Sequence, residues 1–186
     1  MDILSLVEKN KKYAFIGKPC DVLALKNYMS MNPELRSQIV ITMSFFCAGI
    51  PSPMANEKLV QSMQCTVNSL KDFQYRGDGW PGYATAVNAQ NKKYQVDYQT
   101  AWSKYWGRDV RLACRFCMDG IGEAADIACA DLWYLKEGNQ PDFSEHDGRN
   151  IVFCRSALAN LILTDAEAKG YVNVRDYKDR ISQFSY

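Results

Sequence analysis

The stretch of sequence that decides the fold runs from KYAFIG, residues 12–17, to QIVITMSFF, residues 38–46. The first segment is a short β-prone run that ends at a glycine. The second is almost continuously apolar, β-branched or aromatic, which is typical of a strand buried on both faces, as parallel strands usually are. Between them, residues 21–31 have apolar side chains at helical spacing and contain no proline or glycine. A strand, a crossover helix and a second strand predict a right-handed β-α-β unit.

Further strands and helices are expected to pack around this unit, which predicts an α/β protein of mixed α+β character. The periodicity predicts helices over residues 56–70 and 156–169 and extended segments over residues 83–87, 93–98, 125–135, 151–155 and 171–174. We expect Gly170 to end the second of these helices. We also expect one domain over residues 1–186, forming part of a longer protein, because the first strand begins close to Met1.

Composition excludes several classes of partner. The chain has 186 residues, 47% of them hydrophobic, so it can form a core. Its net charge of +1 comes from charges mixed along the chain, which predicts neither a nucleic acid nor a membrane surface as partner. No apolar run of about 18 residues is present, and the first residues lack the pattern of a signal peptide. We therefore expect a cytoplasmic protein.

Four of the seven cysteines can be grouped into one metal site. Cys20 and Cys47 follow the two predicted strands, so a parallel pairing would bring both to the carboxyl edge where open α/β sheets bind ligands. Cys20 would also begin a helix, where the macrodipole favours a thiolate. Cys114 and Cys117 form a C-x-x-C motif, a spacing that lets two sulfurs reach one metal centre.

The residues and their spacing alone leave alternatives to this grouping open. The C-x-x-C motif alone could be half of a zinc site or a redox disulfide, and the two single cysteines could be core residues. Zinc and an iron–sulfur cluster both accept four cysteines, although ligands from distant segments at sheet edges favour a cluster within an enzyme. The other three cysteines are expected to be structural, in a helix (Cys65) and in two strands (Cys129 and Cys154).

A second candidate feature is the glycine-rich turn Arg76-Gly77-Asp78-Gly79-Trp80-Pro81-Gly82. Glycine permits close approach of the backbone to a ligand and proline fixes a turn, so this segment could hold a phosphate or the edge of a flavin. The alternative is a tight hairpin turn. The chain lacks the glycine motif of a Rossmann dinucleotide site and also lacks a P-loop.

Single polar residues give weaker signals. His146 lies in a polar segment and is expected to be a solvated loop residue rather than a catalytic base. Asp126 follows the C-x-x-C motif and could be a structural cap or a partner of the metal ligands. Asp131 ends a predicted strand and could therefore reach a site at the same sheet edge.

These features together resemble the β subunit of the coenzyme F420 hydrogenase/dehydrogenase family, in its C-terminal domain. The resemblance covers residues 10–175, and the motifs that carry it are Gly17–Val22, Ser44–Gly49, Gly77–Gly82, Cys114–Asp119, Ala125–Ile127 and Asp131–Trp133.

The resemblance implies two cofactors, FAD and a [4Fe-4S] cluster. It implies a cluster ligand set of Cys20, Cys47, Cys114 and Cys117, and an FAD site formed by Lys18, Arg76, Gly77, Gly79, Trp80, Pro81 and Gly82. The implied activity is that of an oxidoreductase subunit that passes electrons between a two-electron hydride carrier and one-electron acceptors. Expected partners are a redox protein or a small two-electron carrier, with partner subunits or a further N-terminal domain. The alternative function is a non-catalytic zinc-binding or interaction module derived from such an enzyme.

Overall fold

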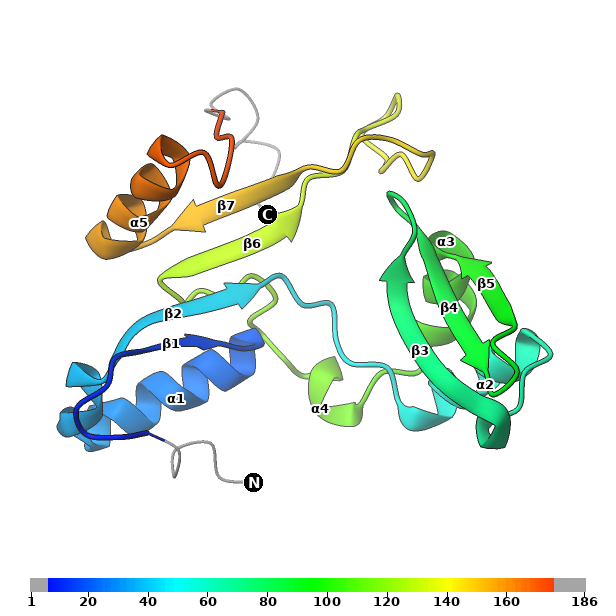
Figure 1. Cartoon of the computed structure of the whole chain (residues 1–186), viewed down its shortest axis with the longest axis horizontal. Helices are drawn as coiled ribbons and strands as arrows, with labels where there is room; N and C mark the ends of the chain where they lie inside the picture. The colour runs from blue at the N-terminus through cyan, green and yellow to red at the C-terminus, as the bar shows by residue number, and fades with distance from the viewer. Residues whose placement is uncertain (1–6, 176–186) are drawn as a thin grey trace.

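The computed structural model describes residues 7–175 and contains two β-sheets with separate hydrophobic cores. The first sheet lies with α1 and α5 in one half of the molecule, the second with α2 and α3 in the other, and α4 lies between them (Figure 1). The first sheet has the order β1 (Tyr13–Ile16), β2 (Ile39–Phe45), β6 (Ile127–Asp131) and β7 (Asn150–Cys154). The second has the order β3 (Leu70–Gly77), β4 (Tyr83–Asn88) and β5 (Lys93–Asp97).

The β-α-β unit forms as the sequence predicts. β1 and β2 are parallel neighbours with Ile16 opposite Met43, and the helix between them, α1, spans Pro19–Met31. Leu25 of this helix packs with Ile39 of β2 in one hydrophobic cluster. β6 is parallel to β2 on its other side, whereas β7 is antiparallel to β6. Three strands therefore have their carboxyl ends at one edge of the sheet, and the predicted mixed α/β class is confirmed.

The second sheet is an antiparallel meander covered by helices. Its strands and helices enclose a core centred on the fully buried Trp106, whose neighbours in the cluster include Leu59 and Ala86. The helical segments of this half and of the connections are η2 (Pro33–Ser37), α2 (Pro53–Ser62), η3 (Val67–Ser69), α3 (Tyr98–Thr100), the π-helix η4 (Ala101–Trp106) and α4 (Leu112–Arg115).

Two of the predicted elements are wrong in extent or type. In place of the helix expected over residues 56–70, α2 ends at Ser62 and a turn follows. Cys65 therefore lies outside a helix, although it is buried as expected. The expected strand over 171–174 does not form, because Tyr171 N–H bonds back to Ala166 O at 2.9 Å at the end of α5 (Ala157–Ala168). Gly170, at φ +75°, ends that helix as predicted.

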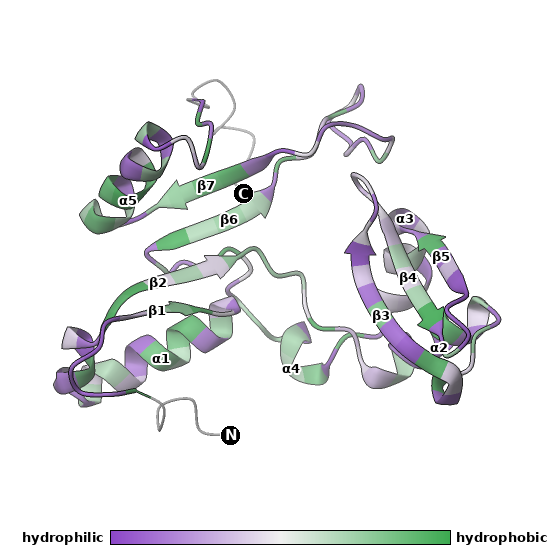
Figure 2. Ribbon diagram, viewed as in Figure 1, coloured by the Kyte–Doolittle hydropathy of each residue, from purple (hydrophilic) through white to green (hydrophobic). Residues whose placement is uncertain are grey.

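The strands of the two sheets differ in hydropathy. Figure 2 shows hydrophobic colour along much of β2, β6 and β7, whereas β3 is largely hydrophilic. None of the helices in residues 7–175 combines the length and the apolar composition that a membrane-spanning helix needs.

Candidate functional site

Two cysteines follow neighbouring parallel strands and reach the same edge of the first sheet. Ile16 lies opposite Met43, and Cys20 and Cys47 follow these two residues at the same short separation along the chain. Because parallel strands end on the same side of a sheet, both thiols lie at its carboxyl edge. This is the juxtaposition that the sequence predicts.

The C-x-x-C motif is brought to this edge by the short helical turn α4. The N–H of Arg111 donates to the carbonyl of Ile50 at 2.9 Å, which fixes α4 to the segment that follows β2. Gly49 has φ +111°, and a Cβ atom added there would lie 3.3 Å from the Cβ of Cys114. A glycine is therefore needed where the chain bearing Cys47 passes the C-x-x-C turn.

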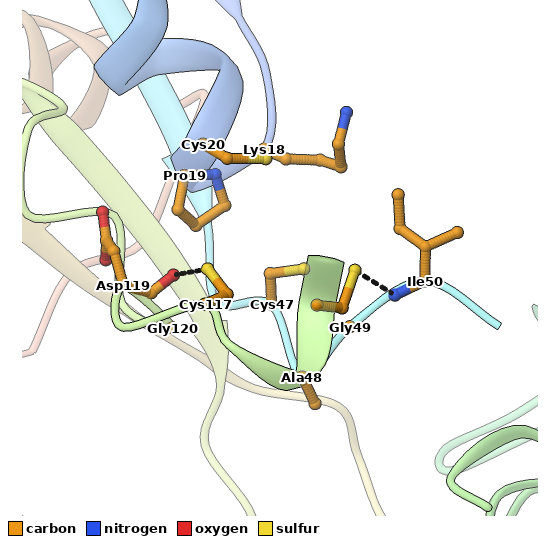
Figure 3. Close-up of a pocket in the computed structure, with 11 residues that line it drawn as sticks. Lys18, Pro19, Cys20, Cys47, Ala48, Gly49, Ile50, Cys117, Asp119 and Gly120 are labelled. Carbon is orange, nitrogen blue, oxygen red and sulfur yellow. Dashed lines mark hydrogen bonds between the residues drawn. The ribbon is translucent and has the colours of Figure 1, made fainter. Parts of the chain in front are cut away.

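The four thiols line one hollow of about 250 Å³, which we call the cysteine hollow. Figure 3 shows Cys20, at the start of α1, facing Cys47 and Cys117 across it. The N–H of Cys47 donates to the carbonyl of Gly120 at 2.9 Å. This bond joins the segment that follows β2 to the segment that follows the C-x-x-C motif. Cys20 and Cys117 are exposed, Cys47 and Cys114 are half-buried, and all four are free thiols. The structure therefore brings together all four predicted ligands.

One lysine and backbone N–H donors lie at the cysteine hollow, which is also lined by Asp119. The N–H of Ile50 lies 3.5 Å from Sγ of Cys114 and donates to it, and Cys20 is the second residue of α1, near the positive end of the helix dipole. Lys18 lines the hollow and pairs with Asp21. The hydrogen bond to Asp21 raises the pKa of Lys18 despite partial burial, and the neighbouring cysteine side chains raise it further. The lysine therefore carries its charge beside the thiols.

The thiols surround the hollow without converging on one point. Within residues 7–175, no three His, Cys, Asp or Glu side chains lie close enough together to hold a single metal ion. A tetrahedral zinc site holds its sulfurs at about 2.3 Å from one ion, whereas an iron–sulfur cluster is held by cysteine thiolates around a group of metal atoms. A set of four free thiols with N–H donors beside them fits a thiolate-bound metal centre.

The glycine-rich segment forms the turn between β3 and β4, so the hairpin alternative describes its backbone. Arg76 and Gly77 are the last residues of β3, and residues 78–82 make the connection. Gly79 and Gly82 have φ of +130° and +79°, values that L side chains rarely adopt. The predicted contact of this turn with FAD stays a prediction.

Arg76 is held by groups of both halves of the molecule. Its guanidinium pairs with Asp131 at the end of β6, and its Nε donates to the carbonyl of Pro81 at 2.7 Å. It also lies over the rings of Trp80, Tyr98 and Trp133, 4.7, 5.1 and 5.3 Å from their centroids, and we call these three residues the aromatic cluster. Asp131 thus lies at the carboxyl edge as predicted, and it holds the turn there.

Comparison with known proteins identifies the family. Residues 10–180 match the family described as the C terminus of the beta subunit of coenzyme F420 hydrogenase/dehydrogenase. The chain belongs to this family. Hydrogenases and dehydrogenases are oxidoreductases, so the family is one of oxidoreductase subunits, and the resemblance inferred from the motifs is confirmed.

Two relatives extend this comparison. The β subunit of an F420-dependent formate dehydrogenase from Methanocaldococcus jannaschii is 24% identical over 174 residues, which cover 94% of this chain and 41% of that protein. A chain of the F420-reducing [NiFe] hydrogenase complex from Methanosarcina barkeri shares the fold with a TM-score of 0.53 and 18% identity, over 86% of this chain and 50% of that chain. The chain therefore spans half or less of each of these relatives.

The motifs of this β-subunit family fall on the two features described above. The cysteine motifs line the cysteine hollow, and the glycine motif forms the β3–β4 turn. A second hollow of about 1110 Å³ runs along β7 and α5 and is lined by none of the predicted site residues. Tyr98 and Trp133, which enclose Arg76, are not among the residues that the sequence predicts for a site. Trp133 lies in the family motif Asp131–Trp133, whereas the sequence signal of Tyr98 is only the aromatic composition of its segment.

His146 and Asp126 stabilise the structure and do not face the cysteine hollow. His146 Nε2 lies 2.9 Å from the carboxylate of Asp142, and its ring stacks on Tyr134 at 4.4 Å. Hydrogen bonds from Ser144 and His146 hold the pKa of Asp142 well below its ordinary value. His146 is therefore a loop residue as expected, although it is half-buried and well contacted. Asp126 takes the structural role that the sequence left open, through hydrogen bonds to β2.

Proposed function

We propose that this chain is the cofactor-bearing part of a flavin- and iron–sulfur-dependent oxidoreductase. In this proposal Cys20, Cys47, Cys114 and Cys117 hold a [4Fe-4S] cluster, and FAD binds beside it. The observation that carries the proposal is the meeting of four free thiols, from three distant segments, around one hollow at the carboxyl ends of the parallel strands β1 and β2.

One further observation favours iron–sulfur over zinc as the metal. Membership of an oxidoreductase family supports a redox-active group, since zinc has no redox chemistry.

The residues of the hollow would stabilise bound thiolates. Lys18 supplies a positive charge, Ile50 N–H donates to a sulfur, and the first turn of α1 directs its dipole at Cys20. When bound, the two groups supply two-electron chemistry at the flavin and one-electron transfer at the cluster. The protein itself positions the groups and excludes competing reactions, and no acid or base side chain is required.

Support for FAD comes from the location of the β3–β4 turn. The ion pair between Arg76 and Asp131 holds this turn at the carboxyl end of β6, and the cysteine hollow lies at the carboxyl ends of β1 and β2 in the same sheet. We propose that FAD contacts the turn at Gly77, Gly79, Trp80, Pro81 and Gly82, together with Arg76, and contacts Lys18 on the cysteine side. Hydride would come from a two-electron carrier, and partner subunits would take or deliver single electrons.

Metal and flavin analysis of four proteins tests the proposal. The chain, its Cys114→Ser and Cys117→Ser variants and a Cys154→Ser control are purified without oxygen and reconstituted with iron, sulfide and FAD. Cys154 is a matched control because it is a half-buried free thiol outside the cysteine hollow. We expect about four iron atoms per chain in the parent and the control and far fewer in the two hollow variants. Iron retained in both hollow variants, or stoichiometric zinc that excludes iron, would contradict the proposal. The zinc result would favour a structural module.

A further inference from the structure

The segment that carries the C-x-x-C motif exposes large apolar side chains around it. Leu112, Phe116 and Met118 are 70%, 77% and 100% exposed. Single exposed apolar residues are ordinary, but three within one short segment form a patch of the kind that marks an interaction site. Figure 2 shows mostly hydrophobic colour on α4, and Figure 1 shows this helix between the two halves of the molecule.

The same segment carries positive charge that its neighbours leave unpaired. Arg111 and Arg115 are exposed, and no carboxylate in residues 7–175 lies within ion-pair distance of either. Asp119 is the first acidic residue after Arg115 in the sequence. Its carboxylate accepts hydrogen bonds from the backbone N–H groups of Ile121 and Gly122. An apolar centre with two free guanidiniums at its border is complementary to a partner with an acidic rim.

This surface borders the proposed cluster directly. Cys114 and Cys117 belong to the segment, and Cys117 is exposed beside Phe116 and Met118. A protein bound on the segment would therefore lie against the proposed ligands, which shortens the path for an electron. Interfaces of electron-transfer proteins are small, so a short exposed segment of this kind is sufficient.

We infer that Arg111, Leu112, Arg115, Phe116 and Met118, which we call the docking surface, bind an acidic one-electron carrier protein. The inference rests on the proposed function, since it names the partner that exchanges electrons with the cysteine site. One electron is lost by the reduced partner and gained by the oxidised one, with no bond made or broken. A second copy of this chain is a poorer occupant, because a two-fold contact would bring Arg111 and Arg115 against their own copies.

Binding of two small redox proteins tests the docking surface. The reconstituted chain is titrated without oxygen with a plant-type ferredoxin, which is acidic, and with cytochrome c, which is basic. We expect ferredoxin to bind and to weaken as salt is raised, and cytochrome c not to bind. The double variant Arg111→Glu/Arg115→Glu should weaken ferredoxin binding by roughly tenfold or more. Phe116→Ser should also weaken it, with less dependence on salt.

The control is the double variant Lys9→Glu/Arg36→Glu. These residues are also exposed and basic, but they precede β1 and β2 and so lie toward the opposite end of the strands. The inference would be overturned if the two double variants bound ferredoxin with equal affinity, or if the chain bound cytochrome c as well as it binds ferredoxin. The inference would also be overturned if sedimentation showed that the docking surface binds a second copy of this chain. Iron is counted in every sample: normal iron with unchanged affinity overturns the docking surface alone, whereas iron missing from the parent chain overturns the proposed function as well.

Discussion

Arg76 forms an ion pair with Asp131 that joins the two sheets of the molecule. Arg76 is at the end of β3 and Asp131 at the end of β6, and both side chains are only 28% exposed. The guanidinium also lies over the rings of Trp80, Tyr98 and Trp133. A planar cation can satisfy a carboxylate and stack on rings at the same time, so one side chain holds the β3–β4 turn at the edge of the first sheet.

Replacing Arg76 by methionine should lower the free energy of unfolding by about 2 kcal/mol, because the change removes the ion pair and the stacking and leaves Asp131 without its partner. Arg76→Lys should recover only part of this loss, since an ammonium is not planar. Urea denaturation measures both. The control is Lys93→Met, which breaks the more exposed pair with Asp78 and should cost less than about 0.5 kcal/mol. An Arg76→Met variant as stable as the control would show that this contact does not join the halves.

Asp126 should make stability depend on pH at the acid end. Its carboxylate accepts hydrogen bonds from the N–H and the hydroxyl of Thr42, at 2.9 and 2.7 Å, and from Lys26 at 3.1 Å. Burial alone would raise the pKa of Asp126, but these bonds outweigh it and lower the pKa. Because the folded pKa is below the unfolded one of about 3.9, the stabilisation is present above that pH and is lost as the pH falls.

The corresponding variant is Asp126→Asn. It should be less stable than the parent at pH 7 by about 1–3 kcal/mol, because Thr42 and Lys26 lose a charged acceptor. The difference should shrink below about pH 4, where the parent also becomes protonated. Asp165→Asn, which removes an exposed pair with Lys169 on α5, should change little at either pH. A gap between parent and Asp126→Asn that stays constant from pH 7 to pH 3 would contradict this account.

The elements predicted correctly are those with a strong local pattern. The β-α-β unit and α5 show clear periodicity and end signals, so local sequence is sufficient for them. The predicted strand over 171–174 is wrong: the N–H of Tyr171 is held by Ala166 at the end of α5, and residues 172–174 pair with no strand in the described part of the chain. The sequence alone does not assign residues 98–106, because their aromatic composition suits a strand as well as the α3–η4 helix that packs Trp106 into a core.

The candidate site also has parts that the sequence predicts and parts that it does not. The meeting of Cys20 with Cys47 follows from parallel strands, which sequence can indicate, and C-x-x-C is a local motif. The contact of Arg76 with Trp133 could not be predicted, because it depends on how two separate sheets lie against each other. No spacing in a single sequence encodes that relationship.

Gly82 and Gly138 allow the β3–β4 turn to be tested with a matched pair of substitutions. Their φ values are +79° and +80°, but a Cβ at Gly82 would lie 2.4 Å from the carbonyl of Gly77 and 2.7 Å from that of Gly79, whereas Gly138 has nothing within 4 Å. Gly138→Ala should therefore cost about 1 kcal/mol from its dihedral angle alone. Gly82→Ala should cost about 2 kcal/mol more, because backbone atoms must move.

Flavin retention gives the same pair of variants a second use. If the turn contacts FAD, Gly82→Ala should lose FAD on gel filtration while it keeps its iron, because the cysteine hollow does not include this turn. Gly138→Ala should keep both. FAD retained by a folded but strained Gly82→Ala protein would mean that the turn is a hairpin and nothing more.

Lys18 should shift the reduction potential of the cluster that we propose for the cysteine hollow. It lines the hollow, and its pKa is raised by Asp21 and by the adjacent Cys20 and Cys47, so it stays charged across the ordinary pH range. A nearby positive charge favours the reduced, more negative form of a cluster. Lys18→Met should therefore lower the midpoint potential by on the order of tens of millivolts, and Asp21→Asn should raise it by a similar amount, because it removes the opposing charge. A redox titration followed by electron paramagnetic resonance measures both, with iron content determined in parallel. Shifts of the same sign in the two variants would show that altered packing, rather than charge, controls the potential.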